Sequence, residues 1–453
     1  MSVVREHPVL ARILADLGDD PSLIDAVSTP PDPVPLPSAL PIDTLAVDSV
    51  DAAALEAAAI VEAASGTLPA VASDPRRIAA AYTSERLFRL DGETPSAWAP
   101  LSGFWPATDG WVRTHGNYPH HAARLRAALG LAADAGADEV RERIASSPAA
   151  ESAERITAAG GIAVVVAPFD GAPTGATDPV LAVEELGRAP ARPAMGGPAP
   201  LAGIRVLDLT RVIAGPVATR TLALFGADVL RIDSPHLPEI GWQHLDSGAG
   251  KRSALLDLDS RADRERFEEL SATADVIVLG YRPASLEALG LAPAAIAQRH
   301  PGVVIGRLSA WGSHDGAATR RGFDSIVQAA SGIAWIESAD GTVPGALPAQ
   351  ALDHSAGYLL AAGIMSRLRL QRRRGGSHLV STSLARVAAL LLSLPRVPRG
   401  RGDGDLADQT QEFTTPRGTL RTVRPAPRFS GSPEVFATAP HPWGTDAADW
   451  LPR

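Results

Sequence analysis

Asp353 stands at the start of a long apolar helical segment, in LPAQALDHSAGYLLAAGI (347–364). An aspartate at such a position commonly caps the first turn or offsets the helix dipole. A carboxylate there can instead act as a nucleophile, because its attack on a thioester gives a mixed anhydride and divides one acyl transfer into easier steps. Free N–H groups at the helix start would stabilise the oxyanion. His354 points in another direction on the helix and is not expected to assist. The residues alone leave both roles of Asp353 open.

Two turns have the composition of a nucleotide site. The glycine-rich GAGKRSALLDLD (248–259) holds Lys251, the only lysine of the chain, next to Arg252. Two cations beside exposed amides can hold a phosphate, but the Walker A spacing is absent, so the residues alone favour a solvated turn. The turn LTRVIAGP (209–216) lacks G-x-G-x-x-G, and NAD binding is therefore unsupported.

Other catalytic classes lack their residues. There is no cysteine, which excludes disulfides, thiolate catalysis and cysteine-ligated metals. The segment HGNYPHH (115–121) clusters His115, His120 and His121, but no acidic ligand stands at a matching spacing. We expect a surface loop leading into a helix there, and no metal. No G-x-S-x-G elbow marks a serine hydrolase.

The elements around these turns alternate between strand and helix. Four near-continuously apolar strands are predicted at 204–210, 227–233, 275–281 and 303–312, with helices between them. Such strands indicate a parallel sheet covered on both faces. Right-handed crossovers then give an α/β, Rossmann-like doubly wound domain. The helix that begins at Asp353 follows the fourth strand.

Composition divides the chain into four parts. Residues 1–95 form a helical N-terminal segment with a Pro-rich linker, and 96–188 form a smaller α/β domain. A second Pro/Gly-rich linker, 189–200, leads into the Rossmann-like domain at 199–395. Residues 396–453 read as a loop and a C-terminal tail. The smaller domain thus precedes the large one.

Charge and hydropathy limit the partners. The net charge of −9 comes without a basic stripe, so nucleic acid is not an expected partner. No apolar run is long enough to cross a bilayer, and the N-terminus does not have the pattern of a signal peptide. We therefore expect a cytoplasmic enzyme that does not bind membranes.

Several segments, taken in order, resemble the class III CoA-transferase family, also called CaiB/BaiF, which includes formyl-CoA transferase, carnitine CoA-transferase and α-methylacyl-CoA racemase. The matching segments are PLAGIRVLDLTRVIAGPVATRTLALFGADVLRID, GKRSALLDLDS, ADVIVLGYRPASLEALGL, RRGFDSIVQAASG, ALDHSAGYLLAAGI and RRGGSHLVSTSL. They lie between residues 199 and 384, less than half of the chain.

The resemblance implies a function and a set of site residues. CoA would move from an acyl-CoA to a carboxylic acid acceptor, with Asp353 carrying first the acyl group and then CoA as covalent aspartyl intermediates. The residues implied to bind CoA are Arg211, Val212, Ala214, Lys251, Arg252 and Tyr281. Acyl-CoA would be the substrate, with no tightly bound cofactor, and the chain would form a homodimer.

The chain also departs from the family. Phe323 stands where the racemase branch has a histidine, which disfavours a two-base racemase mechanism. Ala288 stands where many members have an arginine, and the glycine-rich loop of formyl-CoA transferase has no clear counterpart. The order of the domains indicates a permuted chain or a fused partial copy. The alternatives are an acyl-CoA racemase or isomerase on the same fold, and a CoA-binding protein without catalysis.

Overall fold

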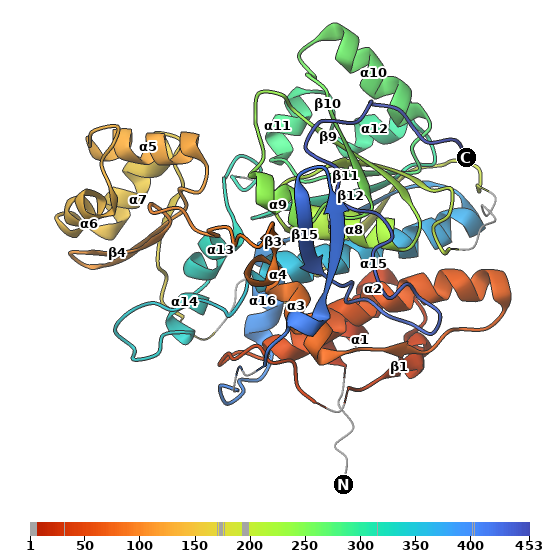
Figure 1. Ribbon diagram of the computed structural model, residues 1–453, viewed down its shortest axis with the longest axis horizontal. Coiled ribbons are helices and arrows are strands. Elements are labelled where there is room, and N and C mark those ends of the chain that lie inside the picture. Colours follow the sequence, from red (N-terminus) through yellow and green to blue (C-terminus); the bar gives the residue numbers. More distant parts are fainter. Residues whose placement is uncertain are drawn as a thin grey trace.

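The computed structural model describes residues 7–30, 32–169, 171, 175, 177–192, 199–314, 316–400, 402 and 404–453. A seven-stranded sheet forms its centre, in the order β10-β9-β8-β11-β12-β13-β7 (Figure 1). In that order the strands are Lys251–Leu255, Asp228–Asp233, Arg205–Leu209, Val276–Leu279, Val304–Ser309, Ser377–Ser383 and Ala182–Gly187. Every pair of neighbours is parallel except β13 and β7. The prediction of an α/β protein with a large, mainly parallel sheet is confirmed.

Alternate residues of the strands point to opposite faces of this sheet. Val206, Val229 and Val276 pack in one buried cluster with α8 (Ala214–Leu224) and α15 (Ala351–Arg374). Their neighbours Leu207, Leu230 and Ile277 pack on the other face, against α10 (Arg261–Ala272), α11 (Pro283–Ala288) and α12 (Pro293–Arg299). Successive side chains of a strand point to opposite faces, so a slip of one residue would exchange the two sets. The apolar strands therefore fix their own register.

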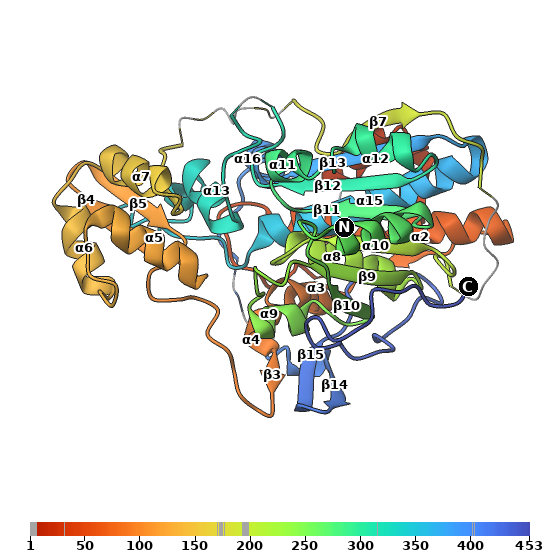
Figure 2. The ribbon, with the colours of Figure 1, turned by 90° about the horizontal axis from the view of Figure 1, so that it is seen from above.

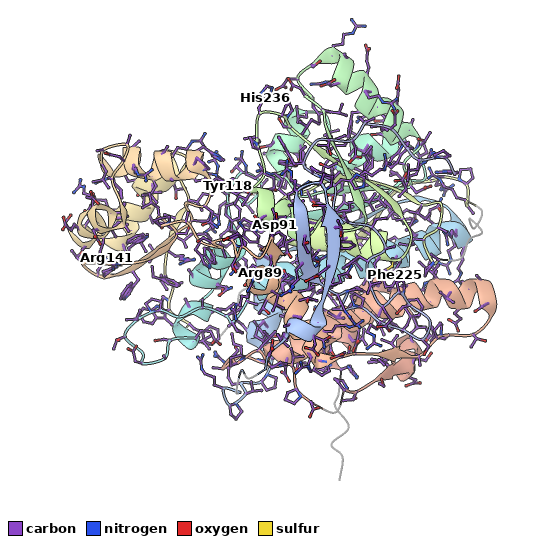
Figure 3. All side chains as sticks on the ribbon, viewed as in Figure 1. Arg89, Asp91, Tyr118, Arg141, Phe225 and His236 are labelled. Carbon is purple, nitrogen blue, oxygen red and sulfur yellow. The ribbon has the colours of Figure 1, made fainter. Side chains whose placement is uncertain are left out.

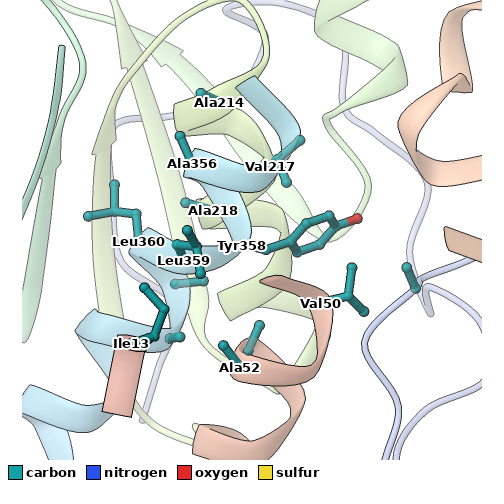
Figure 4. Close-up of a cluster of buried hydrophobic side chains, with 14 of the residues drawn as sticks. Ile13, Val50, Ala52, Ala214, Val217, Ala218, Ala356, Tyr358, Leu359 and Leu360 are labelled. Atoms are coloured by element: carbon teal, nitrogen blue, oxygen red, sulfur yellow. The ribbon is translucent and has the colours of Figure 1, made fainter. Parts of the chain in front are cut away.

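The N-terminal helices belong to the same core as the sheet. The long helix α2 (Ile42–Ser65) lies against α15, and α1 (Pro8–Leu17) packs beside them (Figures 1 and 4). Figure 4 shows Val50 and Ala52 of α2 close to Tyr358 and Leu359 of α15. Alanines such as Ala52 let the two helices approach closely. The helical part of residues 1–95 thus covers the outer side of the helix that carries Asp353.

A smaller α/β unit projects from the large sheet, on the left of Figure 1. Its antiparallel strands are β4 (Gly103–Ala107), β5 (Gly110–Thr114) and β6 (Ala163–Val165). Its helices are α5 (Pro119–Leu129), α6 (Ala137–Ala145) and α7 (Ala149–Ala158), and it has its own buried cluster. Ile162 and Val164 pack against Ile326 of α13 (Asp324–Ala330). The unit therefore docks onto the large part through β6 and α13.

The C-terminal region contains a hairpin that the sequence analysis did not predict. The strands β14 (Thr410–Thr415) and β15 (Gly418–Val423) pair with each other and with β3 (Arg89–Leu90). The final residues then cross the sheet at β9 and β10 (Figure 2), where Asp446 accepts the backbone N–H of Ser253 at 2.7 Å. The tail is thereby fixed to the edge of the large sheet.

The remaining elements are short. They are α3 (Pro75–Tyr82), α4 (Ser84–Leu87), α9 (Gly241–Asp246), α14 (Ile333–Ile336), α16 (Leu384–Ser393), β1 (Val27–Ser28), β2 (Val71–Ala72) and two 3₁₀ helices, Pro21–Ala26 and Ala407–Gln409. Residues 193–198 of the second linker lie outside the described residues, and the bounds of the four parts stay predictions. None of the described helices has both the length and the apolar character needed to span a bilayer.

Candidate functional site

A cavity of about 500 Å³ opens at the carboxyl ends of β8, β11 and β12. The order of strands reverses its direction beside β8: β9 follows β8 on one side, and β11 lies on the other side. Crevices at such a reversal of strand order are the usual ligand sites of open parallel sheets. The N-terminus of α8 also meets this cavity through Ala214, with no side chain capping it. A free helix N-terminus attracts anions.

Two glycines let the strand ends and α8 approach each other at the cavity. A Cβ atom at Gly280 would lie 2.9 Å from the Cβ of Thr210, and one at Gly215 only 2.3 Å from it. Real Cβ contacts are longer than this, so both positions need glycine for the approach. The two glycines thus allow the loop 210–214 to lie directly beside the end of β11.

Five of the seven residues implied by the family resemblance line this cavity. They are Arg211, Val212, Ala214, Tyr281 and Asp353. They come from three separate parts of the sequence, namely the turn after β8, the end of β11 and the start of α15. The structure thus brings together the loop and the carboxyl group that the resemblance linked; their roles stay predictions.

Lys251 and Arg252 are not among the lining residues. The amino group of Lys251 is buried and donates to Asp208 at 3.2 Å and to Thr219 at 3.0 Å. Burial lowers the pKa of Lys251 to about 8, although Asp208 opposes the shift. Arg252 donates to Asp228 at 2.7 Å. Lys251 is engaged in the interior and Arg252 at the edge strand β10; neither lines the cavity, and their role in CoA binding stays a prediction.

Asp353 is paired with a second buried carboxyl, Asp324 of α13. The backbone N–H of Asp353 donates to Asp324 at 2.9 Å, and the amide of Gln328 also donates to Asp324. Asp324 therefore caps α15 from another helix. Burial raises the pKa of Asp324 to about 6, against these hydrogen bonds. Burial, and then the charge of Asp324, raise the pKa of Asp353 well above its usual range.

The donors around Asp324 decide which carboxyl holds the proton. Asp324 accepts N–H groups at a helix start, an arrangement that favours its ionised form. No described side chain donates a hydrogen bond to the carboxyl group of Asp353. Its pKa is therefore set by its burial, with 7% of the residue exposed, and by the adjacent charge of Asp324. We therefore assign the shared proton to Asp353 when the site is empty. The sequence analysis missed Asp324, because it lies 29 positions before Asp353 and no local pattern links them.

Four arginine side chains line the cavity. Arg211 and Arg282 come from the large sheet, Arg321 from the loop before α13, and Arg124 from α5 of the small unit. Guanidinium groups bind phosphate oxygens through charge-assisted hydrogen bonds. The cavity therefore has the charge to hold the phosphates of a nucleotide.

A buried network around Glu239 holds the loop after β8. Glu239 accepts from Arg231 at 3.0 Å, from the backbone N–H of Val212 at 3.2 Å and from Tyr118 at 2.5 Å. Val212 has a φ of 70°, which is rare for a β-branched residue and needs support from its surroundings. Burial raises the pKa of Glu239, but Arg231 and Arg211 more than offset this and hold it at about 2. Glu239 is thus an anion that fixes Val212.

Tyr118 joins the small unit to this network. Figure 3 shows it between the small unit and the large sheet. Its ring also lies 5.0 Å from the guanidinium carbon of Arg211, within the range of a cation–π contact. Neither Glu239 nor Tyr118 stood out in the sequence, since the pair joins positions 121 residues apart.

The three histidines of HGNYPHH were predicted on a surface loop, and only His120 is exposed. His115 is buried and stacks on Phe323 with ring centroids 3.8 Å apart, and His121 is buried at the start of α5. Burial first, and neighbouring positive charge next, lower the pKa of both buried imidazoles to about 3. Among the residues that the structure describes, no group of three or more potential ligands could hold a metal ion.

Residues 201–423, from the strand β8 to the end of the hairpin, match the model of "CoA-transferase family III". This segment is about half of the chain, and over it the chain is similar to CoA-transferase family III. The match includes the loop 211–214, Tyr281 and Asp353, and excludes the small unit and residues 1–95. The family resemblance inferred from the ordered segments is confirmed.

Named relatives match between 40% and 49% of the chain. The probable fatty acyl-CoA transferase Rv3272 of Mycobacterium tuberculosis is 30% identical over 253 residues, which are 49% of this chain and 64% of that protein. The succinyl-CoA–L-malate CoA-transferase alpha subunit of Chloroflexus aurantiacus is 30% identical over 41% of this chain and 46% of its own length. The human succinyl-CoA:glutarate CoA-transferase is 29% identical over 40% and 44%.

A crystal structure of Rv3272 aligns over 42% of this chain and 56% of that chain, with 32% identity and a TM-score of 0.40. The chain thus spans less than two thirds of the length of these relatives of CoA-transferase family III.

Proposed function

We propose that the chain transfers CoA from an acyl-CoA to a carboxylic acid, with Asp353 as the covalent nucleophile. The observation that carries the proposal is the position of Asp353. Its side chain borders a cavity that lies at the carboxyl ends of the parallel strands and has four arginines in its lining. The match of residues 201–423 to the model of CoA-transferase family III supports the reaction class.

The two ends of the cavity suit the two ends of an acyl-CoA. The arginines and the N-terminus of α8 favour the phosphates, and Tyr281 adds an aromatic face. The buried start of α15 receives the thioester. The strand order, with the cavity where the chain reverses beside β8, is in keeping with the Rossmann-like arrangement that we propose for this part.

The first half of the reaction uses the ionised form of Asp353. One carboxylate oxygen attacks the thioester carbonyl, the carbon–sulfur bond breaks, and CoA leaves as a thiolate from an acyl-aspartyl anhydride. The thiolate then attacks the aspartyl carbonyl and displaces the donor acid as a carboxylate. Asp353 is left as an aspartyl-CoA thioester.

The second half reverses these steps with the acceptor. The acceptor carboxylate attacks the aspartyl-CoA carbonyl and releases the thiolate, which then attacks the acceptor's own carbonyl in the new anhydride. The product acyl-CoA forms, and Asp353 returns as a carboxylate. No oxidant, metal or further reactant is needed to balance these steps, so we propose no tightly bound cofactor.

Isomerisation at the α-carbon is not proposed. Phe323 stands where the racemase branch of the family has a histidine. Its hydrocarbon ring cannot accept or donate a proton, so it cannot act as an acid or base at the α-carbon. The homodimer and the cytoplasmic location implied by the family remain part of the proposal.

Trapping with hydroxylamine tests the nucleophile. We expect the protein incubated with an acyl-CoA and hydroxylamine to acquire a hydroxamate at Asp353, detectable by peptide mass spectrometry, because hydroxylamine attacks the activated aspartyl carbonyl. The Asp353→Asn variant is the control and should remain unmodified. CoA turnover without any label at Asp353 would contradict the mechanism.

The carboxyl pair predicts a characteristic dependence on pH. Asp353 must lose its proton to attack, and its pKa is raised, so the rate of hydroxamate formation should rise with pH at values above the ordinary range of an aspartate. In Asp324→Asn the neighbouring negative charge is gone, the pKa of Asp353 falls, and the same rise should occur at lower pH.

The same substitution weakens the cap of α15 and should lower the free energy of unfolding by about 1–2 kcal/mol. The pH profile of single-turnover trapping distinguishes the two effects, since a loss of stability alone leaves the midpoint of the profile unchanged. An unchanged midpoint in a folded Asp324→Asn protein would refute the coupling.

A further inference from the structure

Asp353 borders a second, more enclosed cavity of about 60 Å³, which we call the inner cavity. Tyr118, Val212 and Phe323 line both this cavity and the larger one, so the two spaces adjoin around these side chains. A CoA held at the arginines would fill the larger cavity. The inner cavity is then the space left for the acyl group beyond the reacting carbonyl.

The inner cavity is small. A water-sized site takes roughly 10–15 Å³ in this measure of volume, so the space holds about four or five atoms of that size. An acid with three or four carbons fits, whereas the chain of a fatty acid does not.

Its walls contain polar groups that lack partners within the described part of the protein. One carboxylate oxygen of Asp246 accepts from Ser84 at 2.6 Å, while the other is buried without a hydrogen bond. The Nδ1 atoms of His115 and His354 are likewise buried and unpaired. Buried polar atoms are normally hydrogen-bonded, and leaving them unpaired costs free energy. A polar ligand in the cavity would offset that cost.

The charges around the cavity favour an uncharged ligand. Burial lowers the pKa of His115 and His354 to about 3, so both imidazoles are neutral at pH 7. Each then offers one donor and one acceptor. The guanidinium of Arg220 is engaged with the carbonyl oxygen of Asp246 at 2.7 Å and with the ring of Phe436. The carboxyl groups of Asp246 and Glu85 oppose a further negative charge.

Part of the wall comes from outside the segment that matches the family. Seven of the twenty lining residues precede residue 201, among them Ser84, Trp98 and His115. The chemistry of these side chains therefore has to be considered together with that of the matched segment.

We propose that the inner cavity selects a short acyl group, of three or four carbons, that carries a hydroxyl group and no second charge. The hydroxyl donates to the free oxygen of Asp246 and accepts from an imidazole. This inference rests on the proposed CoA transfer through Asp353 and adds the substrate class to it.

The test compares acyl-CoAs of matched shape on the full chain. The single-turnover rate of CoA release in hydroxylamine, whose dependence on acyl-CoA concentration gives kcat/KM for the first half-reaction, is measured with 3-hydroxybutyryl-, butyryl-, succinyl- and octanoyl-CoA, which makes the readout independent of the acceptor. We expect kcat/KM for 3-hydroxybutyryl-CoA to exceed each of the others by at least about tenfold, since a site built to hydrogen-bond a hydroxyl rejects analogues that lack it. A preference for octanoyl- or succinyl-CoA would overturn the inference and leave Asp353 chemistry standing. Release with none of the four would overturn the proposed function itself.

Two variants locate the selectivity. Asp246→Leu keeps the volume and removes the acceptor, so the advantage of 3-hydroxybutyryl- over butyryl-CoA should fall by about tenfold or more, with butyryl-CoA as the internal control. Trp98→Ala widens the cavity at a side chain that is 40% exposed and outside the buried clusters, and it should raise kcat/KM for octanoyl-CoA by about tenfold. An unchanged ratio in a folded Asp246→Leu protein, or no gain in Trp98→Ala, would refute the assignment of the cavity.

Discussion

Asp353→Asn is expected to reduce the rate of CoA transfer by at least about 10³-fold while the protein stays folded and continues to bind acyl-CoA. The amide has nearly the same shape as the carboxyl. It lacks the carboxylate oxygen that attacks the thioester, so the acyl-aspartyl anhydride cannot form. Burial and the charge of Asp324 raise the pKa of Asp353, so the folded protein disfavours a charge at this position. The neutral amide introduces no charge there, and the melting temperature should change little.

The measurement combines steady-state rates with binding. Transfer is followed by chromatography of the acyl-CoA products, and acyl-CoA affinity by calorimetry on both proteins. Asp353→Glu serves as the matched control: it keeps the carboxyl but moves it by one methylene, and a misplacement of that size should already cost about 10²-fold. An asparagine variant as active as the parent would remove Asp353 from the chemistry.

Much of the large sheet was predictable because each strand contains its own signal. The predicted segments 204–210, 227–233, 275–281 and 303–312 contain β8, β9, β11 and β12, since apolar residues on both sides of a strand require cover on both faces. The edge strand β7 was missed: its exposed, acidic sequence Ala182–Gly187 has no such pattern, and only pairing with β13 makes it a strand. The hairpin of β14 and β15 was missed for a similar reason.

The site was predictable only where one segment contained the information. Asp353 was a candidate from its place at a helix start, whereas the loop 211–214 came only from the family resemblance; both line the cavity. Lys251 also came from the resemblance, and in the structure its amino group is bound to Asp208. A sequence shows which cations exist but not which carboxylates they meet. Asp324 and Glu239 were missed because their roles depend on contacts between distant segments.

Arg231→Met is expected to have the largest effect on stability, a loss of about 3–5 kcal/mol in the free energy of unfolding at pH 7. Arg231 is 1% exposed and binds both oxygens of Asp233, at 2.7 and 3.0 Å, in addition to Glu239. Methionine fills much of the same volume but leaves two buried carboxylates without their main counter-charge. Arg266→Met is the matched control, because its ion pairs are partly exposed and should contribute less than about 1 kcal/mol.

The effect of pH on this variant has a definite sign. In the wild type the pKa of Glu239 is about 2 against 4.5 when unfolded, so its ionic stabilisation is complete above pH 4.5 and is lost as the pH falls towards 2. Without Arg231 the buried carboxyls take up protons at higher pH, and protonation relieves the unpaired charge. The deficit of Arg231→Met relative to the wild type should therefore be smaller at pH 5 than at pH 7 in denaturant unfolding. A deficit that stays constant, or that grows on acidification, would show that Arg231 acts by packing alone.

Glu239 also holds the N–H of Val212, so a folded Arg231→Met protein should bind acyl-CoA more weakly, whereas Arg266→Met should not.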